Sequence, residues 1–197
     1  MSVSAEIPDL RAVRPRGNDL VLLRPWQEAD LPVIAEASSD PYIPLITTVP
    51  ARYTAAGGAA WLRRQRDQVA QGRGCPMAIC ARDTGAVVGL ATIAGITWVH
   101  RRADIGYWVL PSRRGRGYAR AAAALLPDIA REIGLVRIEA LVEPDNHASQ
   151  AVCRSLGFAQ EGLLRSYYRI GAQNRDMIMF SLLVASAAAD PGLPAAR

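Results

Sequence analysis

The chain has 197 residues, half of them hydrophobic, which is enough for one well-filled core and too short for two large domains. Its formal net charge is +5, and all 23 basic residues are arginine. This charge favours a protein that binds an anionic small molecule over a nucleic-acid module, because neither a base-reading helix nor an aromatic stacking platform is evident. No apolar run reaches the eighteen or so residues of a membrane span, so no membrane partner is expected.

The two ends of the chain are predicted to be flexible, because they are rich in small residues and proline and have little to bury. These ends are residues 1–17 and 185–197, which leaves one domain over residues 18–184. The first segment also lacks the apolar core of a secretion signal, so the protein is expected to be soluble and cytoplasmic. Three cysteines without a C-x-x-C pair, beside only two histidines, argue against a metal site.

The region between the ends has a mixed pattern of strands and helices. It begins with a strand (19–26), two helices (28–39 and 57–72) and three strands in an apparent meander (76–81, 86–99 and 105–110). It continues as helix (118–134), strand (137–143), helix (148–157) and two strands (159–170 and 175–184). This order predicts an α+β fold with a mixed, mostly antiparallel central sheet of about seven strands, flanked by helices. Pro127 falls inside a predicted helix and is expected to kink or end it.

Residues 111–119 have the pattern of a turn between a strand and a helix. Pro111 ends the strand because it has no N–H for the ladder. Gly115 and Gly117 have no Cβ to hold a ligand away from the backbone, and the following helix begins with unpaired N–H groups. Three arginines add positive charge at the same place, namely Arg113, Arg114 and Arg116. The turn therefore predicts a site for a phosphate or pyrophosphate.

Three kinds of phosphate-binding turn compete for this segment. A P-loop is excluded because it requires a lysine, and the chain has none. A dinucleotide-binding turn is disfavoured because Arg120 occupies the third glycine position. The run Arg114-Gly115-Arg116-Gly117-Tyr118-Ala119 instead fits the Q/R-x-x-G-x-G/A turn that holds the coenzyme A pyrophosphate in GNAT-superfamily acyltransferases. The plainer interpretation is a solvated turn that caps a helix.

A second motif lies downstream and supplies the context that the turn alone lacks. Asn146 and Ser149 form N-x-x-S, followed by Leu156-Gly157-Phe158 and Glu161-Gly162. Together with residues 103–119 and with Asp176 in the last strand, this motif resembles the RimJ/RimL type, the ribosomal-protein N-terminal acetyltransferase branch of the superfamily. The resemblance covers residues 19–183. It implies a GNAT-like fold in which two neighbouring strands splay apart to form an acyl-CoA cleft.

The resemblance also implies an activity. The protein would be an N-acyltransferase that moves the acetyl group of acetyl-CoA, its co-substrate, to a primary amine by direct attack in a ternary complex, without a metal. The acceptor would be a protein N-terminus or a small amine. Backbone groups near Val109 and Leu110 would bind pantetheine and polarise the thioester carbonyl, and Asn146 would contact the coenzyme. The pyrophosphate would lie on Arg114, Gly115, Arg116, Gly117, Tyr118 and Ala119.

Two residues receive chemical roles from the same resemblance. In the wider superfamily a tyrosine seven positions after the asparagine often protonates the leaving thiolate, but Cys153 stands there, so Ser149 is expected to be the proton donor. Asp104 stands where the branch usually has glutamate, and it is expected to accept the amine proton through water or to orient the ammonium. The competing interpretations are helix capping by Asn146 and Ser149, and an ion pair between Asp104 and one of the arginines just before it.

The acceptor side of the site is less clearly indicated. The aromatic candidates for an acceptor groove, which would otherwise serve as packing, are Trp61, Trp98, Tyr167 and Tyr168. His100 is a weaker candidate for the base. The carboxylates are too scattered along the chain to indicate an acidic groove; they are Glu28, Asp30, Asp40 and Asp104. A non-catalytic acyl-CoA-binding regulatory protein and a transferase with a longer acyl donor are the alternative functions, and a homodimer is an alternative to a monomer.

Overall fold

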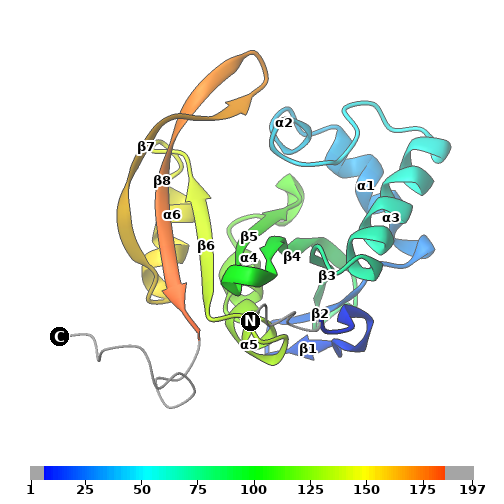
Figure 1. The fold of residues 1–197 in the computed structure, drawn as a ribbon. Helices are drawn as coiled ribbons and strands as arrows, with labels where there is room; N and C mark the ends of the chain where they lie inside the picture. The colour runs from blue at the N-terminus through cyan, green and yellow to red at the C-terminus, as the bar shows by residue number, and fades with distance from the viewer. Residues whose placement is uncertain (1–6, 185–197) are drawn as a thin grey trace.

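The computed structural model describes residues 7–184, which build one sheet with helices on both faces (Figure 1). The strands are β1 (Arg16–Gly17), β2 (Val21–Pro25), β3 (Cys75–Ala81), β4 (Val87–Thr97), β5 (Arg102–Val109), β6 (Arg137–Val142), β7 (Ala159–Ile170) and β8 (Gln173–Leu183). The helices are α1 (Leu31–Ser38), α2 (Ile43–Ile46), α3 (Ala55–Ala70), α4 (Tyr118–Ala123), α5 (Leu126–Glu132) and α6 (His147–Ser155). The predicted C-terminal tail, 185–197, and residues 1–6 lie outside the described residues.

The strands form a single sheet in the order β1-β2-β3-β4-β5-β6-β8-β7. Every neighbouring pair is antiparallel except β5 and β6, which confirms the predicted α+β class and the mixed, mostly antiparallel sheet. The sheet has eight strands rather than about seven, because the short β1 pairs with β2. This strand lies in the segment predicted to be a flexible end, where Leu10 and Val13 are packed into the core.

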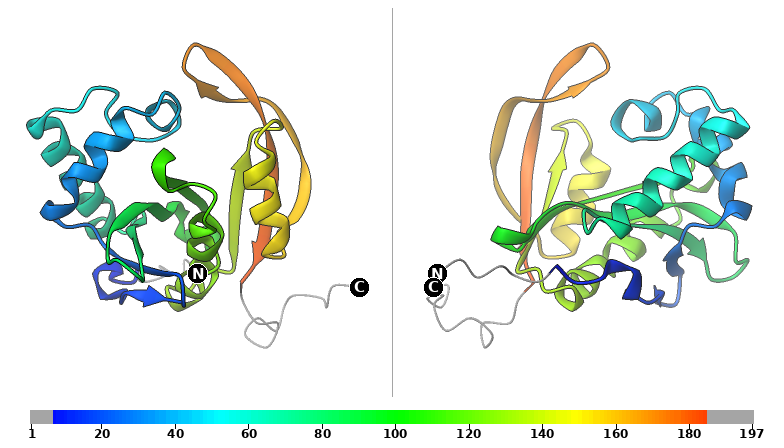
Figure 2. Two further views of the ribbon diagram at one scale, coloured as in Figure 1. Left: turned by 180° about the vertical axis from the view of Figure 1, so that it is seen from behind. Right: turned by 45° about the vertical axis from the view of Figure 1, so that its right-hand side comes forward.

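The core has two layers, one on each face of the sheet. Side chains alternate between the faces of a strand, so β3 buries Met77 and Ile79 against α4–α6 and buries Ala78 and Cys80 against α1–α3. Figure 2 shows the first three helices on one side of the sheet and the last three on the other. Trp61 of α3 is almost fully buried in the second layer. This burial on both faces explains why β3 reads as an unbroken apolar run.

β5 and β6 separate in the middle of the sheet. They pair in parallel only at their beginnings, where residues 102–104 face residues 137–139. Beyond Asp104, β5 continues to Val109 without a partner on that side, and β6 continues to Val142. This divergence is the splayed strand pair that the resemblance implied, and it opens a gap that reaches both layers.

The helix after the glycine-arginine turn is interrupted, as Pro127 predicted. α4 ends at Ala123, and α5 begins at Leu126 with Pro127 in its first turn, where its missing N–H needs no helical partner. The interruption lies a full turn of helix after Gly117, so it leaves the start of α4 intact. None of the helices within residues 7–184 has the length and apolarity that a membrane crossing requires.

Candidate active site

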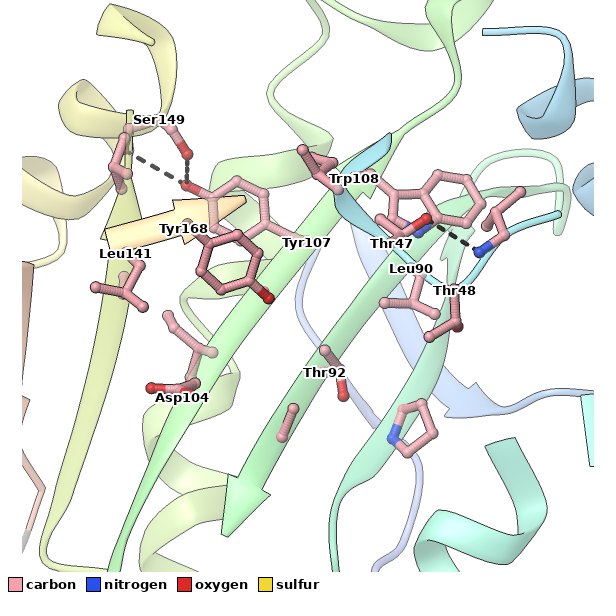
Figure 3. Close-up of a pocket in the computed structure, with 18 of the residues that line it drawn as sticks. Thr47, Thr48, Leu90, Thr92, Asp104, Tyr107, Trp108, Leu141, Ser149 and Tyr168 are labelled. Atoms are coloured by element: carbon pink, nitrogen blue, oxygen red, sulfur yellow. Dashed lines mark hydrogen bonds between the residues drawn. The ribbon is translucent and has the colours of Figure 1, made fainter. Parts of the chain in front are cut away.

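A cavity of about 360 Å³ occupies the gap between β5 and β6 (Figure 3). Its walls come from both layers and from the β7–β8 hairpin. The lining residues with carboxylate or aromatic side chains, together with two polar residues at the start of α6, are Tyr42, Trp61, Asp104, Tyr107, Trp108, Glu143, Asn146, Ser149 and Tyr168. Trp108 packs in the α1–α3 layer, whereas Tyr107 packs against the α4–α6 layer, because neighbouring residues of β5 point to opposite faces. The cavity therefore connects the two faces of the sheet through the gap.

Ser149 lies in the first turn of α6, where its side chain meets β5. The Asn146 carboxamide oxygen caps the helix by accepting from the Ser149 N–H at 3.0 Å. The Ser149 hydroxyl is not used for capping and instead forms a 2.8 Å hydrogen bond with the Tyr107 hydroxyl. Capping therefore accounts for the Asn146 oxygen and leaves the Ser149 hydroxyl available at the cavity wall.

Tyr107 is a site residue that the sequence analysis missed. Burial raises the pKa of its phenol to about 12, an effect that the hydrogen bond to Ser149 partly offsets, so the phenol is neutral at ordinary pH. Figure 3 shows its hydroxyl directed at Ser149. The available signal was strand alternation, which places Tyr107 on the face opposite Trp108, and hence toward the helix that carries Ser149.

Asp104 is partly buried and lines the cavity without an ion pair among the described residues. Burial raises its pKa, and the nearby Glu139 carboxylate raises it further, while Arg102 lowers it. The ion pair considered for Asp104 is not found within residues 7–184, because Arg102 binds Glu139 at 2.9 Å and Arg101 donates to the Gly134 carbonyl at 2.8 Å. A carboxylate with a raised pKa that faces a cavity is suited to accept a proton.

The glycine-arginine turn has the predicted backbone. Gly115 and Gly117 have φ values of 74° and 79°, in the left-handed region that favours glycine, and Gly117 caps the start of α4. The Arg114 side chain is engaged within the protein, because it binds Asp40 at 2.9 Å and donates from Nε to the Val109 carbonyl at 3.1 Å. It therefore fastens the turn to the end of β5 and to the segment before α2.

The end of β5 has a backbone donor that faces the gap. Leu110 is buried and gives its N–H to the Val88 carbonyl of β4 at 2.9 Å. Because consecutive N–H groups of a strand point in opposite directions, the Val109 N–H points away from β4 and toward the gap. Leu110, predicted with Val109 as a coenzyme contact, thus has no free backbone donor.

The charged residues that line the cavity are both acidic, although the spacing of the carboxylates along the chain did not indicate an acidic groove. Its charged lining residues are Asp104 and Glu143, which lies just after β6. Glu143 is buried and binds Arg175 at 3.0 Å, and it accepts a hydrogen bond from the Tyr42 hydroxyl. The remaining predicted carboxylates do not line the cavity: Glu28 is solvent-exposed, Asp30 binds Arg24, and Asp40 binds Arg114.

Only some of the remaining residues considered from the sequence lie at the cavity. Trp61 and Tyr168 line the cavity, whereas Trp98 and Tyr167 do not. His100 is exposed at the end of a turn and lies outside the cavity. Burial raises the pKa of Cys153 to about 11, which keeps it a thiol and disfavours a nucleophilic role. No group of three or more potential metal ligands lies together within residues 7–184.

Comparisons with known proteins agree with this fold. The family model of the acetyltransferase (GNAT) domain matches residues 21–159. The structure of Mycobacterium smegmatis RimJ in complex with CoA-disulfide is 32% identical, with a TM-score of 0.75 over 87% of this chain and 84% of that one. The uncharacterized N-acetyltransferase p20 of Bacillus licheniformis is 31% identical over 162 residues, which are 82% of this chain and 91% of p20.

A further relative matches over a shorter stretch. Spermidine N(1)-acetyltransferase of Escherichia coli K12 is 33% identical over 95 residues, which are 48% of this chain and 51% of that protein. The chain belongs to the GNAT family of acetyltransferases. The predicted resemblance to this family and to its RimJ/RimL-type members is confirmed, and the protein is an N-acetyltransferase by family.

Proposed function

We propose that the protein transfers the acetyl group of acetyl-CoA to a primary amine by direct attack in a ternary complex. The observation that carries this proposal is the cavity itself. It crosses the sheet between β5 and β6 and presents the hydroxyls of Ser149 and Tyr107 on one side and the Asp104 carboxylate on the other. An acyl transfer to an amine needs a proton donor for the leaving group and a proton acceptor for the nucleophile, and this arrangement offers both.

Coenzyme A would lie along the end of β5 and the start of α4. The Val109 N–H is the candidate donor for the thioester carbonyl, where it would stabilise the charge that develops on the oxygen. The N–H groups at the start of α4 and the bare backbone of Gly115 and Gly117 suit the pyrophosphate. Arg114 would act mainly by fastening this turn, because its guanidinium is already bound to Asp40. Asn146 lines the same cavity and would contact the pantetheine arm.

The reaction uses the two sides of the cavity in sequence. Asp104 takes a proton from the ammonium, directly or through water, and the neutral amine attacks the thioester carbon. A C–N bond forms and the nitrogen releases its second proton to solvent. The C–S bond then breaks, and the thiolate receives the hydroxyl proton of Ser149, which solvent restores. Either hydroxyl can donate in the hydrogen bond between Tyr107 and Ser149. In this proposal Tyr107 is the donor during the reaction, so that the Ser149 proton is left to point at the sulfur. Because both substrates are held in one cavity, the amine attacks a thioester that is already in place, and the reaction does not depend on a bimolecular encounter in solution.

The acceptor is proposed to be cationic before it reacts. Of the two acidic lining residues, Glu143 is already paired with Arg175, so Asp104 is the carboxylate that would attract an ammonium. The remaining walls are mostly apolar, which suits an ammonium carried on an alkyl or peptide body. Two acceptors of this kind are a polyamine, named by the spermidine N(1)-acetyltransferase relative, and a protein N-terminus, which the resemblance to the ribosomal-protein N-terminal acetyltransferase branch implies.

The test is thiol release from acetyl-CoA with a panel that contains spermidine and a hexapeptide with a free N-terminus. Ser149→Ala is expected to lower kcat about a hundredfold or more, the range of a general acid, while calorimetric titration shows acetyl-CoA affinity within about twofold of wild type. Unchanged turnover would remove Ser149 from its role. Acetyl-CoA binding without turnover of any amine would favour the non-catalytic acyl-CoA-binding protein, and turnover restricted to a longer acyl donor would replace the acetyl group in the proposal.

A further inference from the structure

The β7–β8 hairpin contains an irregularity close to the cavity. Its ladder pairs Leu164 with Met177 and next pairs Tyr168 with Arg175. Three residues of β7, 165–167, therefore stand opposite the single residue Asp176. Such a bulge bends the strand that carries it and re-aims the side chains that follow.

The bulge is held in an unfavourable backbone conformation by one hydrogen bond. Ser166 has a φ of 52°, in the left-handed region that residues with a Cβ rarely adopt. The Asp176 carboxylate accepts a hydrogen bond from the Ser166 N–H at 2.7 Å, directly across the bulge. Strained residues persist where surrounding contacts fix them, and they gather at functional sites. The hydrogen bond to Asp176 is a contact of this kind, so the bulge is expected to position a nearby functional side chain.

Beyond the bulge, the hairpin curves toward α2 (Figure 1). A Cβ placed at Gly171, in the hairpin turn, would lie 3.9 Å from the Leu45 side chain of α2. Tyr168 is the second residue after Ser166, and it lines the cavity although it belongs to an edge strand. Its neighbour Tyr167 is 54% exposed and does not line the cavity. Figure 3 shows the Tyr168 ring projecting into the space that Asp104 and Tyr107 also line.

We propose that Tyr168 contacts the acceptor amine, and that Asp176 is the positioning residue that aims it by holding the β7 bulge. An aromatic ring beside an acidic wall is a favourable environment for an ammonium and the methylenes attached to it. Tyr168 comes from the hairpin and Asp104 comes from β5, so together they would hold the acceptor from two elements. This inference rests on the proposed function, because it assigns a role to residues of the same cavity.

Steady-state kinetics of the wild-type protein are first measured with spermidine and with the hexapeptide that has a free N-terminus. The amine with the higher kcat/KM is then used for all variants. Tyr168→Ala is expected to raise the KM of that amine about five- to thirtyfold, the range that a partly desolvated cation–π contact gives. The affinity for acetyl-CoA, measured by calorimetry, is expected to stay within about twofold of wild type. Tyr167→Ala is the matched control, because it removes a neighbouring tyrosine outside the cavity, and it should leave both quantities unchanged.

The positioning role of Asp176 is tested by a double-mutant cycle with Tyr168. Asp176→Ala should raise the KM of the amine nearly as much as Tyr168→Ala, and the double variant should be little worse than either single variant. Asp176→Asn keeps an oxygen that can accept from Ser166, so it should retain most of the amine affinity, and it serves as the readout if Asp176→Ala fails to fold. A purely structural role for Asp176 predicts additive effects and a parallel loss of acetyl-CoA affinity.

The outcomes separate this inference from the proposed function. Amine acetylation with an amine KM that is the same in Tyr168→Ala and wild type overturns the inference and leaves the proposed function intact. Additive effects of Tyr168→Ala and Asp176→Ala overturn the positioning role alone. Acetyl-CoA binding without acetylation of either probe overturns the acceptor half of the proposed function, and with it the role of Tyr168.

Discussion

At the scale of single residues, the hydrogen bond between Tyr107 and Ser149 gives a direct prediction. Tyr107→Phe removes the hydroxyl that is hydrogen-bonded to the Ser149 hydroxyl while keeping the aromatic ring in its packing. We expect kcat to fall about two- to twelvefold, the equivalent of one net hydrogen bond, with acetyl-CoA affinity retained. The measurement is kcat by thiol release beside calorimetric titration. Tyr167→Phe is the control, and an unaltered kcat in Tyr107→Phe would show that the hydroxyl pair has no part in the reaction.

The raised pKa of Asp104 predicts the pH dependence. A carboxylate base works only when it is ionised, so kcat/KM for the amine falls as the pH drops through the pKa of Asp104, which lies above the ordinary 3.8. Glu139→Gln removes the neighbouring negative charge that raises this pKa, and it also frees Arg102 to favour the ionised form. Both effects lower the pKa. The acid-side break of the pH profile should therefore move to lower pH, and a break that stays or rises would remove Asp104 from its role as the base.

Sequence alone located several of these residues and missed others for a physical reason. Ser149, Asn146 and Asp104 fall in motifs of neighbouring residues, and the structure brings all three to one cavity. Tyr107 acquires its role only through a contact with a residue 42 positions away. Arg114 binds Asp40, which lies 74 positions earlier in the chain. A local motif does not show this contact, so the sequence indicates a phosphate ligand where the structure shows an arginine bound within the protein.

At the scale of elements, the glycine turn is predicted to bind coenzyme through its backbone. At Gly115 nothing lies within 4 Å of an added Cβ, so Gly115→Ala should add backbone strain of about 1–2 kcal/mol, typical of the left-handed region, without a clash inside the protein. The added methyl group and the shifted backbone should weaken acetyl-CoA binding at least tenfold by calorimetry.

Gly85→Ala provides a matched control for this turn. Gly85 has a φ of 72° and equally open space around an added Cβ, but it lies in the β3–β4 turn away from the cavity. Both variants should lower the melting temperature by similar amounts, while only Gly115→Ala should lose coenzyme affinity. Equal coenzyme affinity in the two variants would place the pyrophosphate elsewhere.

Some features of the helices and strands could be predicted from the sequence and others could not. The break before α5 followed from Pro127, because proline removes a helical hydrogen bond wherever it stands. The short α2 has only four residues, too few for a periodic signal, and yet Ile46 and the neighbouring Tyr42 line the cavity. The bulge at Ser166 is equally invisible in the sequence, because strand pairing and the Asp176 contact determine it rather than local preference.

At the scale of the whole molecule, an ion pair and a hydrogen bond link strands β6, β8 and β7. Arg137 of β6 binds Glu161 of β7 at 2.6 Å across β8, where the Ser181 hydroxyl also donates to Glu161 at 2.6 Å. The hydrogen bond from Arg137, followed by that from Ser181, lowers the pKa of Glu161 to about 2. Because the ionised form is favoured in the folded state, its stabilisation is present above the ordinary pKa of 4.5 and is lost as the pH falls toward 2.

This linkage predicts the acid stability of the protein. Glu161→Gln should flatten the decline of the free energy of unfolding between about pH 4.5 and pH 2, measured by urea unfolding at several pH values. The effect should be modest, since Glu161 is largely exposed and solvent screens the pair. An unchanged slope would show that the Arg137–Glu161 pair contributes nothing to the linkage.

If the cavity between the splayed strands brings an acetyl donor and an amine together, both products of the transfer must appear, and product analysis is the measurement that decides this. The wild-type protein is incubated with acetyl-CoA and the amine panel, and free coenzyme A and acetylated amine are quantified by mass spectrometry. The two products are expected to form in equal amounts and only when an amine is present. Coenzyme A release at the same rate without an amine, or acetyl-CoA binding with no acetylated amine from any acceptor in the panel, would contradict this expectation.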